Sequence, residues 1–150
     1  MSDIEHESHY TENVQEHLLK VQSLLEKHAL VESLAHRQLV PRNERHELVE
    51  SLLHKQHLNA LQEKLDSLHP ADIAYILEAL PIEQRLLVWE LVRAERDGDI
   101  LIEVSDAVRE SLIATMSREE LREAAEQLDT DEIADLAPDL PQSVMLDLYQ

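Results

Sequence analysis

Gly98 is the only glycine in this chain of 150 residues, and its rarity constrains the fold more than any other feature of the sequence. The tight turns that join β-strands favour glycine. Phenylalanine is absent, aromatic residues make up 3% of the chain, and the apolar residues are mainly leucine and alanine. Leucine, alanine and glutamate favour helices, whereas strands favour β-branched and aromatic residues. The sequence therefore predicts an all-α fold.

The beginning of the chain predicts one amphipathic helix. Apolar residues recur every three or four positions from Val14 to Leu25, which is the period of a helix with one apolar face. We expect this helix to end before Pro41, and we expect the polar residues 1–12 to be frayed. Residues 1–40 are therefore interpreted as a leader that contains an amphipathic helix.

Residues 41–150 have the pattern of a helical repeat domain. One helical pattern runs from Asn43 to Leu65, and helices of only about ten residues, too short to be stable alone, follow it. Prolines or capping residues mark each start, and two segments place an acceptor three residues before a glutamate, as in a capping box. The predicted starts are Pro70, Pro81, Ser105, Ser117 (with Glu120), Asp129 (with Glu132) and Pro141.

A pattern of six residues recurs 60 positions later in the chain. The two copies are Leu68, Ile73, Ala74, Ile76, Leu80, Pro81 and Leu128, Ile133, Ala134, Leu136, Leu140, Pro141. Two units of about 30 residues fit this interval, with residues 104–116 as a weaker middle member. Repeated antiparallel helix pairs predict a right-handed superhelical solenoid. Because the helical pattern continues to the last residue, we expect a longer polypeptide.

The formal net charge of −19 is concentrated in the second half of the chain. Residues 1–69 contain 12 acidic and 7 basic side chains, whereas residues 70–150 contain 20 acidic and 6 basic ones. Such a field repels nucleic acids and anionic membranes, and it attracts cations or basic protein surfaces. Solubility alone is the alternative explanation of the charge.

The sequence offers little for catalysis. One glycine cannot supply the glycine-rich loops that bind nucleotides, and the absence of cysteine excludes thiol nucleophiles, disulfides and thiolate metal sites. No serine elbow is visible, and neither a secretory signal nor an uncharged apolar run of roughly 18 residues is present. We interpret the chain as a soluble domain that is not an enzyme and does not insert into a membrane.

All nine histidines precede residue 70. His54 and His57 share one helical face, a spacing that can bind zinc or nickel if His46 or Glu50 supplies a third ligand. Neither residue stands at a compelling position, so a solvated polar face is favoured over a transition-metal site.

The carboxylates of the second half suggest a magnesium-binding surface. Mg²⁺ retains much of its water and takes one or two carboxylates per site. Asp131 and Asp135 lie four residues apart on one helical face, where a cation would relieve their repulsion. Asp97 and Asp99 flank Gly98, the one place where the backbone is free to turn sharply. Ordinary capping and surface charges are the alternative interpretation of these four carboxylates.

Three segments carry a recognisable pattern: LHPADIAYILEALP at residues 68–81, AERDG at 94–98 and QLDTDEIADL at 127–136. In series, they resemble repeats of the intracellular N domain of the MgtE family of magnesium transporters. The resemblance covers about residues 40–150, and residues 1–40 resemble a leader found in some members. Flagellar motor switch proteins of the FliG type share a similar helical repeat. A protein-interaction scaffold without ion sensing is therefore the alternative function.

The resemblance implies a superhelical domain at the cytoplasmic face of the membrane, followed by a CBS-domain pair and a transmembrane pore domain in a homodimeric protein. It also implies that Mg²⁺ is a weak regulatory ligand, bound at acidic interfaces between the N domain and the CBS pair, where it favours the closed pore. The family's ligand positions fall on Asp131, Asp135 and Asp99, and Asp97 is the rival of Asp99. Conduction belongs to the pore domain and not to this chain.

Overall fold

The computed structural model describes residues 2–37, 55–56 and 58–148, and every regular element within them is helical, which confirms the all-α class. The chain divides into two compact units, Met1–Ser67 and Leu68–Gln150, which we describe separately. Residue 41, the predicted start of the repeat domain, lies outside the described residues. Within those residues, none of the helices combines the length and apolar character that crossing a bilayer requires.

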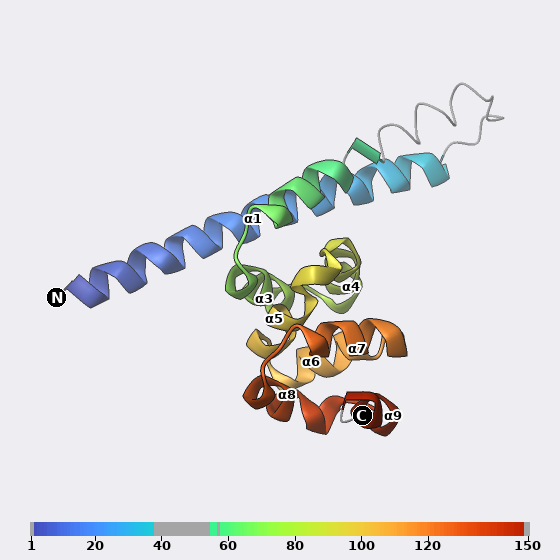
Figure 1. Cartoon of the computed structure of the whole chain (residues 1–150). Helices are drawn as coiled ribbons and strands as arrows, with labels where there is room; N and C mark the ends of the chain where they lie inside the picture. Colours follow the sequence, from blue (N-terminus) through green and yellow to red (C-terminus); the bar gives the residue numbers. More distant parts are fainter. Residues whose placement is uncertain (1, 38–54, 57, 149–150) are drawn as a thin grey trace. The chain divides into compact units, whose positions relative to one another are not determined.

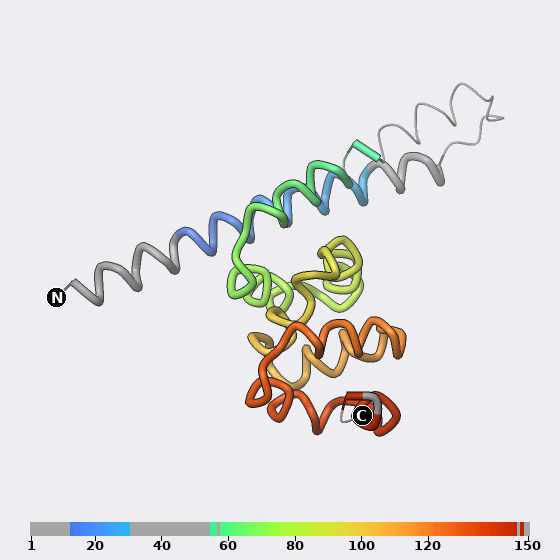
Figure 2. Tube along the Cα trace, in the orientation of Figure 1, coloured from blue at the N-terminus to red at the C-terminus, as the bar shows by residue number. Residues whose placement is uncertain are grey.

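The first unit contains the long helix α1 (Ser2–Arg37) and a second helix that includes residues 58–66. The two helices run side by side in opposite directions (Figures 1 and 2). The apolar stripe predicted for α1 is buried at Val14, Val21 and Leu25. The helical period in the sequence therefore identified the packed face of α1.

Helix α1 begins at Ser2, twelve residues before the first residue of the predicted apolar stripe. Extending an existing helix costs little, because each added residue gains a hydrogen bond without a new nucleation step. The second helix contacts α1 through polar groups as well, since Lys64 Nζ lies 2.8 Å from His17 Nδ1. The histidine pair His54 and His57 lies outside the described residues.

The second unit is a series of short helices. In chain order they are α3 (Pro70–Ala79), α4 (Ile82–Leu91), the 3₁₀ turn η1 (Ala94–Arg96), α5 (Asp97–Glu103), α6 (Asp106–Ile113), α7 (Arg118–Glu126), α8 (Thr130–Leu136), the 3₁₀ turn η2 (Ala137–Asp139) and α9 (Gln142–Leu148). Helix α3 packs on α4 and α5, helix α5 packs on α7 and α8, and α7 packs on α9. The elements are thus stacked in series along the unit (Figure 1).

The predicted start residues all stand at the first residue of a helix or one position before it: Pro70, Pro81, Ser105, Ser117, Asp129 and Pro141. Both predicted capping boxes form. In the first, Glu120 N donates to Ser117 Oγ over 3.1 Å, and Ser117 N donates to Glu120 Oε1 over 3.2 Å. These reciprocal bonds satisfy two N–H groups that the helix itself leaves without acceptors.

An arginine side chain links the two helices of the first pair in this unit. Arg85 of α4 donates from Nε to the carbonyl oxygen of Leu77 over 2.8 Å and from Nη2 to that of Leu80 over 3.2 Å. The last carbonyls of a helix have no donor within that helix, and a guanidinium presents several N–H groups in a fixed fork. Arg85 therefore completes the C-terminal end of α3 from the following helix.

Arg109 of α6 repeats this arrangement 24 residues later. It donates from Nε to Leu101 O over 2.8 Å and from Nη2 to Val104 O over 3.3 Å, and its Nη1 lies 3.3 Å from Asp139 Oδ2. The pairs α3–α4 and α5–α6 are thus related by 24 residues, and a further 36 residues separate Val104 from Leu140 before α9. The expected division into two intervals of about 30 residues is wrong, although the interval of 60 is retained.

Candidate metal-binding surface

The acidic residues at the start of α8 are of two kinds. Asp129 and Glu132 form the second capping box, in which Asp129 Oδ1 accepts from Glu132 N over 2.9 Å and Glu132 Oε1 accepts from Asp129 N over 3.1 Å. Their carboxylates are occupied by the N-terminal N–H groups of the helix. Asp131 and Asp135 are exposed, and within the described part of the chain no hydrogen bond or ion pair engages their carboxylates.

Asp131 and Asp135 stand one turn apart on α8 and share a face of that helix. Two like charges at this spacing repel by a few tenths of a kcal/mol, and a cation bound between them reverses the sign of that interaction. Carboxylate oxygens are the ligands that Mg²⁺ prefers in proteins. The two side chains therefore fit a magnesium ion in chemistry, charge and accessibility.

Asp99 is also exposed, and it lies on α5, the helix that packs against α8. Among the described residues, however, no group of three or more histidine, aspartate or glutamate side chains is arranged to hold a metal ion. The structure therefore does not bring Asp99, Asp131 and Asp135 together as one preformed centre. Two carboxylates leave most of the coordination of Mg²⁺ to water or to ligands from elsewhere.

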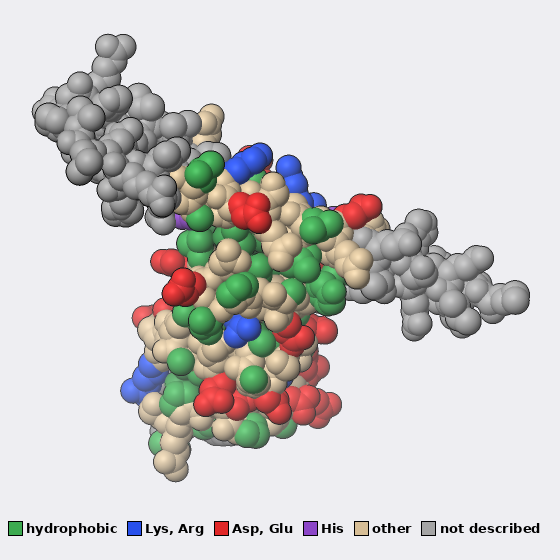
Figure 3. All heavy atoms as spheres, turned by 180° about the vertical axis from the view of Figure 1, so that it is seen from behind, with side chains coloured by type: hydrophobic (Ala, Val, Ile, Leu, Met, Phe, Trp, Pro, Cys, Tyr) green, Lys and Arg blue, Asp and Glu red, His purple; other side chains and the backbone are tan. Residues whose placement is uncertain are grey.

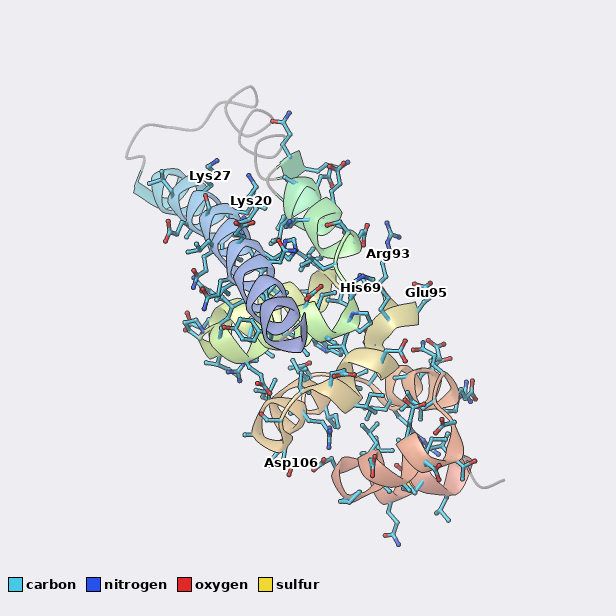
Figure 4. The ribbon with its side chains drawn as sticks, turned by 90° about the vertical axis from the view of Figure 1, so that its left-hand side faces the viewer. Lys20, Lys27, His69, Arg93, Glu95 and Asp106 are labelled. Carbon is cyan, nitrogen blue, oxygen red and sulfur yellow. The ribbon has the colours of Figure 1, made fainter. Side chains whose placement is uncertain are left out.

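Asp97, the rival of Asp99, lies inside the second unit with only 8% of its surface exposed. Burial, together with the smaller effect of the nearby negative charges of Glu120 and Glu95, raises the pKa of Asp97 from 3.8 to about 7. Glu95 extends outward from η1 (Figure 4). The burial of Asp97 favours Asp99 as the partner of Asp131 and Asp135 on a surface.

Gly98 is the second residue of α5, and no described residue has a positive φ, so the conformational freedom of this glycine is not used for a turn. A Cβ atom at this position would lie 2.5 Å from the carbonyl oxygen of Ala124 in α7. Gly98 N donates to Gln127 Oε1 over 3.2 Å, and Gln127 Nε2 donates to Ala94 O over 2.9 Å. The glycine is required because two helices approach closely here.

On the visible face of the second unit, acidic side chains form a band near the lower end and lie along the edges, among apolar side chains and a smaller number of basic ones (Figure 3). Three arginines of this unit donate to main-chain carbonyl oxygens inside it: Arg85 to Leu77, Arg96 to Leu68 and Arg109 to Leu101. These three are half of the six basic side chains of residues 70–150, which also contain 20 acidic ones. The excess of negative charge attracts cations to this unit.

Residues 68–148 match the family model of the MgtE intracellular N domain, and this match begins at the first residue of the second unit. The match covers more than half of the chain, and with the all-helical fold it defines the class of the protein, an intracellular domain of a magnesium transporter. The chain belongs to the MgtE family and contains its N-terminal intracellular domain. A search of curated proteins gave no match.

Three features of this unit were not predicted from the sequence. They are the repeated contacts of Arg85 and Arg109 with helix carbonyls, the reason for glycine at position 98, and the burial of Asp97. A signal for the last was present. Asp97 follows Ile73 by 24 residues and precedes Ile133 by 36, so it stands at a position where both other repeats have isoleucine. The weak middle repeat hid this relation, because only the interval of 60 residues was recognised.

Proposed function

We propose that this chain is the Mg²⁺-responsive regulatory domain of its transporter and has no enzymatic activity of its own. In this proposal Asp131 and Asp135, with Asp99, bind Mg²⁺ weakly at an acidic interface that is completed by the CBS-domain pair of the same protein. The supporting observation is the pair of exposed carboxylates on α8, one turn apart and separate from the cap that engages Asp129 and Glu132.

Regulation follows from the charge of the surfaces. When Mg²⁺ is scarce, two acidic surfaces repel each other and the domain stays undocked; Mg²⁺ between them screens this repulsion. A ligand shifts an equilibrium only by its difference in affinity for the two states, so Mg²⁺ must bind the docked state more tightly. Two carboxylates on one side supply too few ligands for tight binding without the second surface. Docking then holds the pore closed.

The wider arrangement belongs to the same proposal. The domain is a right-handed superhelix at the cytoplasmic face of the membrane, the full-length protein is a homodimer, and the pore lies in a transmembrane domain outside this chain. The family match supports these statements because they describe the family that the chain resembles. A protein-interaction scaffold is the outcome to be expected if docking does not respond to Mg²⁺.

The decisive experiment replaces Asp131 and Asp135 by alanine in the full-length transporter. We expect pore closure to shift to higher Mg²⁺ concentration, and Mg²⁺ to protect the linker to the CBS pair from protease less well, because the closed state alone loses ligands.

The matched control is Glu119→Ala with Glu123→Ala, an exposed pair of carboxylates four residues apart on α7 that removes the same charge. The control should close at the Mg²⁺ concentration of the parent protein. Closure of the Asp131/Asp135 variant at the parent concentration refutes the assignment of these residues.

A further inference from the structure

The second unit contains a cavity of about 540 Å³ between α4, η1 and the residues that lead into α7. The residues that line it include Leu86, Trp89, Met116 and Asp97. Neither Asp131 nor Asp135 contributes to it, so the cavity is distinct from the proposed magnesium surface.

A buried carboxylate stands in this cavity at a position of the helical repeat that is otherwise apolar. Ile73 is 0% exposed and Ile133 is half-buried, and Asp97 is their equivalent in the middle repeat. Asp97 is more than nine-tenths buried, and its Oδ1 has no hydrogen-bond partner among the described residues. Burying a polar atom without a partner costs free energy, so such an atom calls for a ligand or another explanation.

The charges around the cavity define what can bind. Glu90 and Glu120 also line it, and none of the lining residues is basic. Glu120 accepts a hydrogen bond from Ser117 N through its Oε1, which fixes this carboxylate at the start of α7. The cavity thus presents two further negative charges and supplies Asp97 with no positive partner. A ligand that donates hydrogen bonds can satisfy Asp97, and the negative charges of Glu90 and Glu120 favour one that is also cationic.

The apolar walls narrow the class of cation. An indole face attracts an ammonium ion, and the side chains of Leu86 and Met116 offer apolar contacts to methylene groups. Hydrated Mg²⁺ gains little from such walls, because it binds carboxylates and water. We infer that this cavity binds the ammonium group of a primary alkylamine, with Asp97 as its principal acceptor and Trp89 as one wall.

Two sources can supply this chemical group: a free diamine or polyamine, and a lysine side chain of another polypeptide segment. Both place an ammonium group at the end of a methylene chain. The two sources are compared by titrating the chain with 1,4-diaminobutane and with N-acetyl-lysine amide. Tighter binding of one compound identifies the source, and saturable binding of either supports the inference.

Trp89 is the only tryptophan of the chain and lines the cavity, so its fluorescence reports binding directly. We expect a saturable change of Trp89 emission with each amine, at least tenfold weaker binding in Asp97→Asn, and weaker binding in Glu120→Gln. The Asn and Gln side chains keep the shape of the acids they replace, and circular dichroism verifies that both variants fold. Glu103→Gln, on the exposed side of the same helix α5, should bind as the parent does.

The remaining titrations distinguish binding at a specific site from nonspecific attraction of cations to the acidic surface. 1-Butanol, which lacks the positive charge, and tetramethylammonium, which lacks an N–H donor, should give no saturable change in the same concentration range. The inference is overturned by an equal response to Mg²⁺ or sodium chloride, by unchanged affinity in Asp97→Asn, or by the absence of a saturable response to both amines. The magnesium surface on α8 is tested independently of these results, because none of its residues is altered.

Discussion

Replacing Gly98 by alanine tests the close approach of α5 and α7. Within a helix, alanine is favoured over glycine by about 1 kcal/mol, so a site without steric conflict would be stabilised. In this structure the added Cβ would lie 2.5 Å from Ala124 O and 3.0 Å from Gln127 Oε1. Overpacking of this kind costs about 1–3 kcal/mol, and loss of the hydrogen bond from Gly98 N to Gln127 adds about 1 kcal/mol. We therefore expect a net destabilisation of about 1–3 kcal/mol.

The measurement is urea denaturation followed by the fluorescence of Trp89, which reports the second unit only. The propensity contribution is measured in the same protein with Ala134→Gly, because Ala134 is the exposed repeat equivalent of Gly98 on α8. That control should lose about 1 kcal/mol, as expected for glycine in a helix. A Gly98→Ala variant that is more stable than the parent by a similar amount refutes the steric explanation.

Three further predictions use the same denaturation assay. Asp97 takes up its proton more readily in the folded state, with a pKa of about 7 against 3.8, so its contribution to stability is complete below pH 3.8 and is lost as the pH rises through about 7. Asp97→Asn should therefore be as stable as the parent at low pH and more stable by roughly 2 kcal/mol above neutrality. This is about half of the free energy that corresponds to the whole pKa shift, because solvent screens part of the charge. An equal difference in stability at all pH values contradicts this prediction. Arg109→Met leaves Asp139 and the carbonyls of Leu101 and Val104 without their donor, and it should lower the free energy of unfolding by about 3 kcal/mol. The control Arg122→Met removes only exposed ion pairs and should lower it by under about 0.5 kcal/mol. Equal losses of stability refute the role of Arg109. Millimolar Mg²⁺ should stabilise the isolated chain by only about 0.4 kcal/mol when its concentration equals the Kd. The double substitution Asp131→Ala with Asp135→Ala should abolish that stabilisation. A large stabilisation that survives the double substitution shows that the metal binds elsewhere.

The sequence predicted local features of the fold well because each has a cause within a few residues. Capping at Ser117 and Asp129 depends on a glutamate three positions later, and the buried stripe from Val14 to Leu25 follows from the helical period. The reason for Gly98 could not be predicted, because it depends on the carbonyl of Ala124 in another helix.

The candidate metal site was predictable only in part. The spacing of Asp131 and Asp135 placed them on one face, and the structure adds that they are separate from the cap. Spacing alone could not distinguish Asp97 from Asp99, because the difference lies in which side chain faces the core. That orientation depends on how α5 packs against other helices, and this packing cannot be derived from the spacing of residues within α5.

The two arginine arrangements limit where this domain can change in length. In each case the helix with the accepting carbonyl oxygen, of Leu77 or Leu101, is joined to the helix of the arginine by two residues. These links are Leu80 with Pro81 and Val104 with Ser105. The link residues are extended, so each residue inserted there could displace the arginine by up to about 3.3 Å and take it out of hydrogen-bonding reach of those carbonyls. Insertions and deletions among relatives should therefore be absent from these links and occur instead between α6 and α8, where the repeat lengthens from 24 to 36 residues.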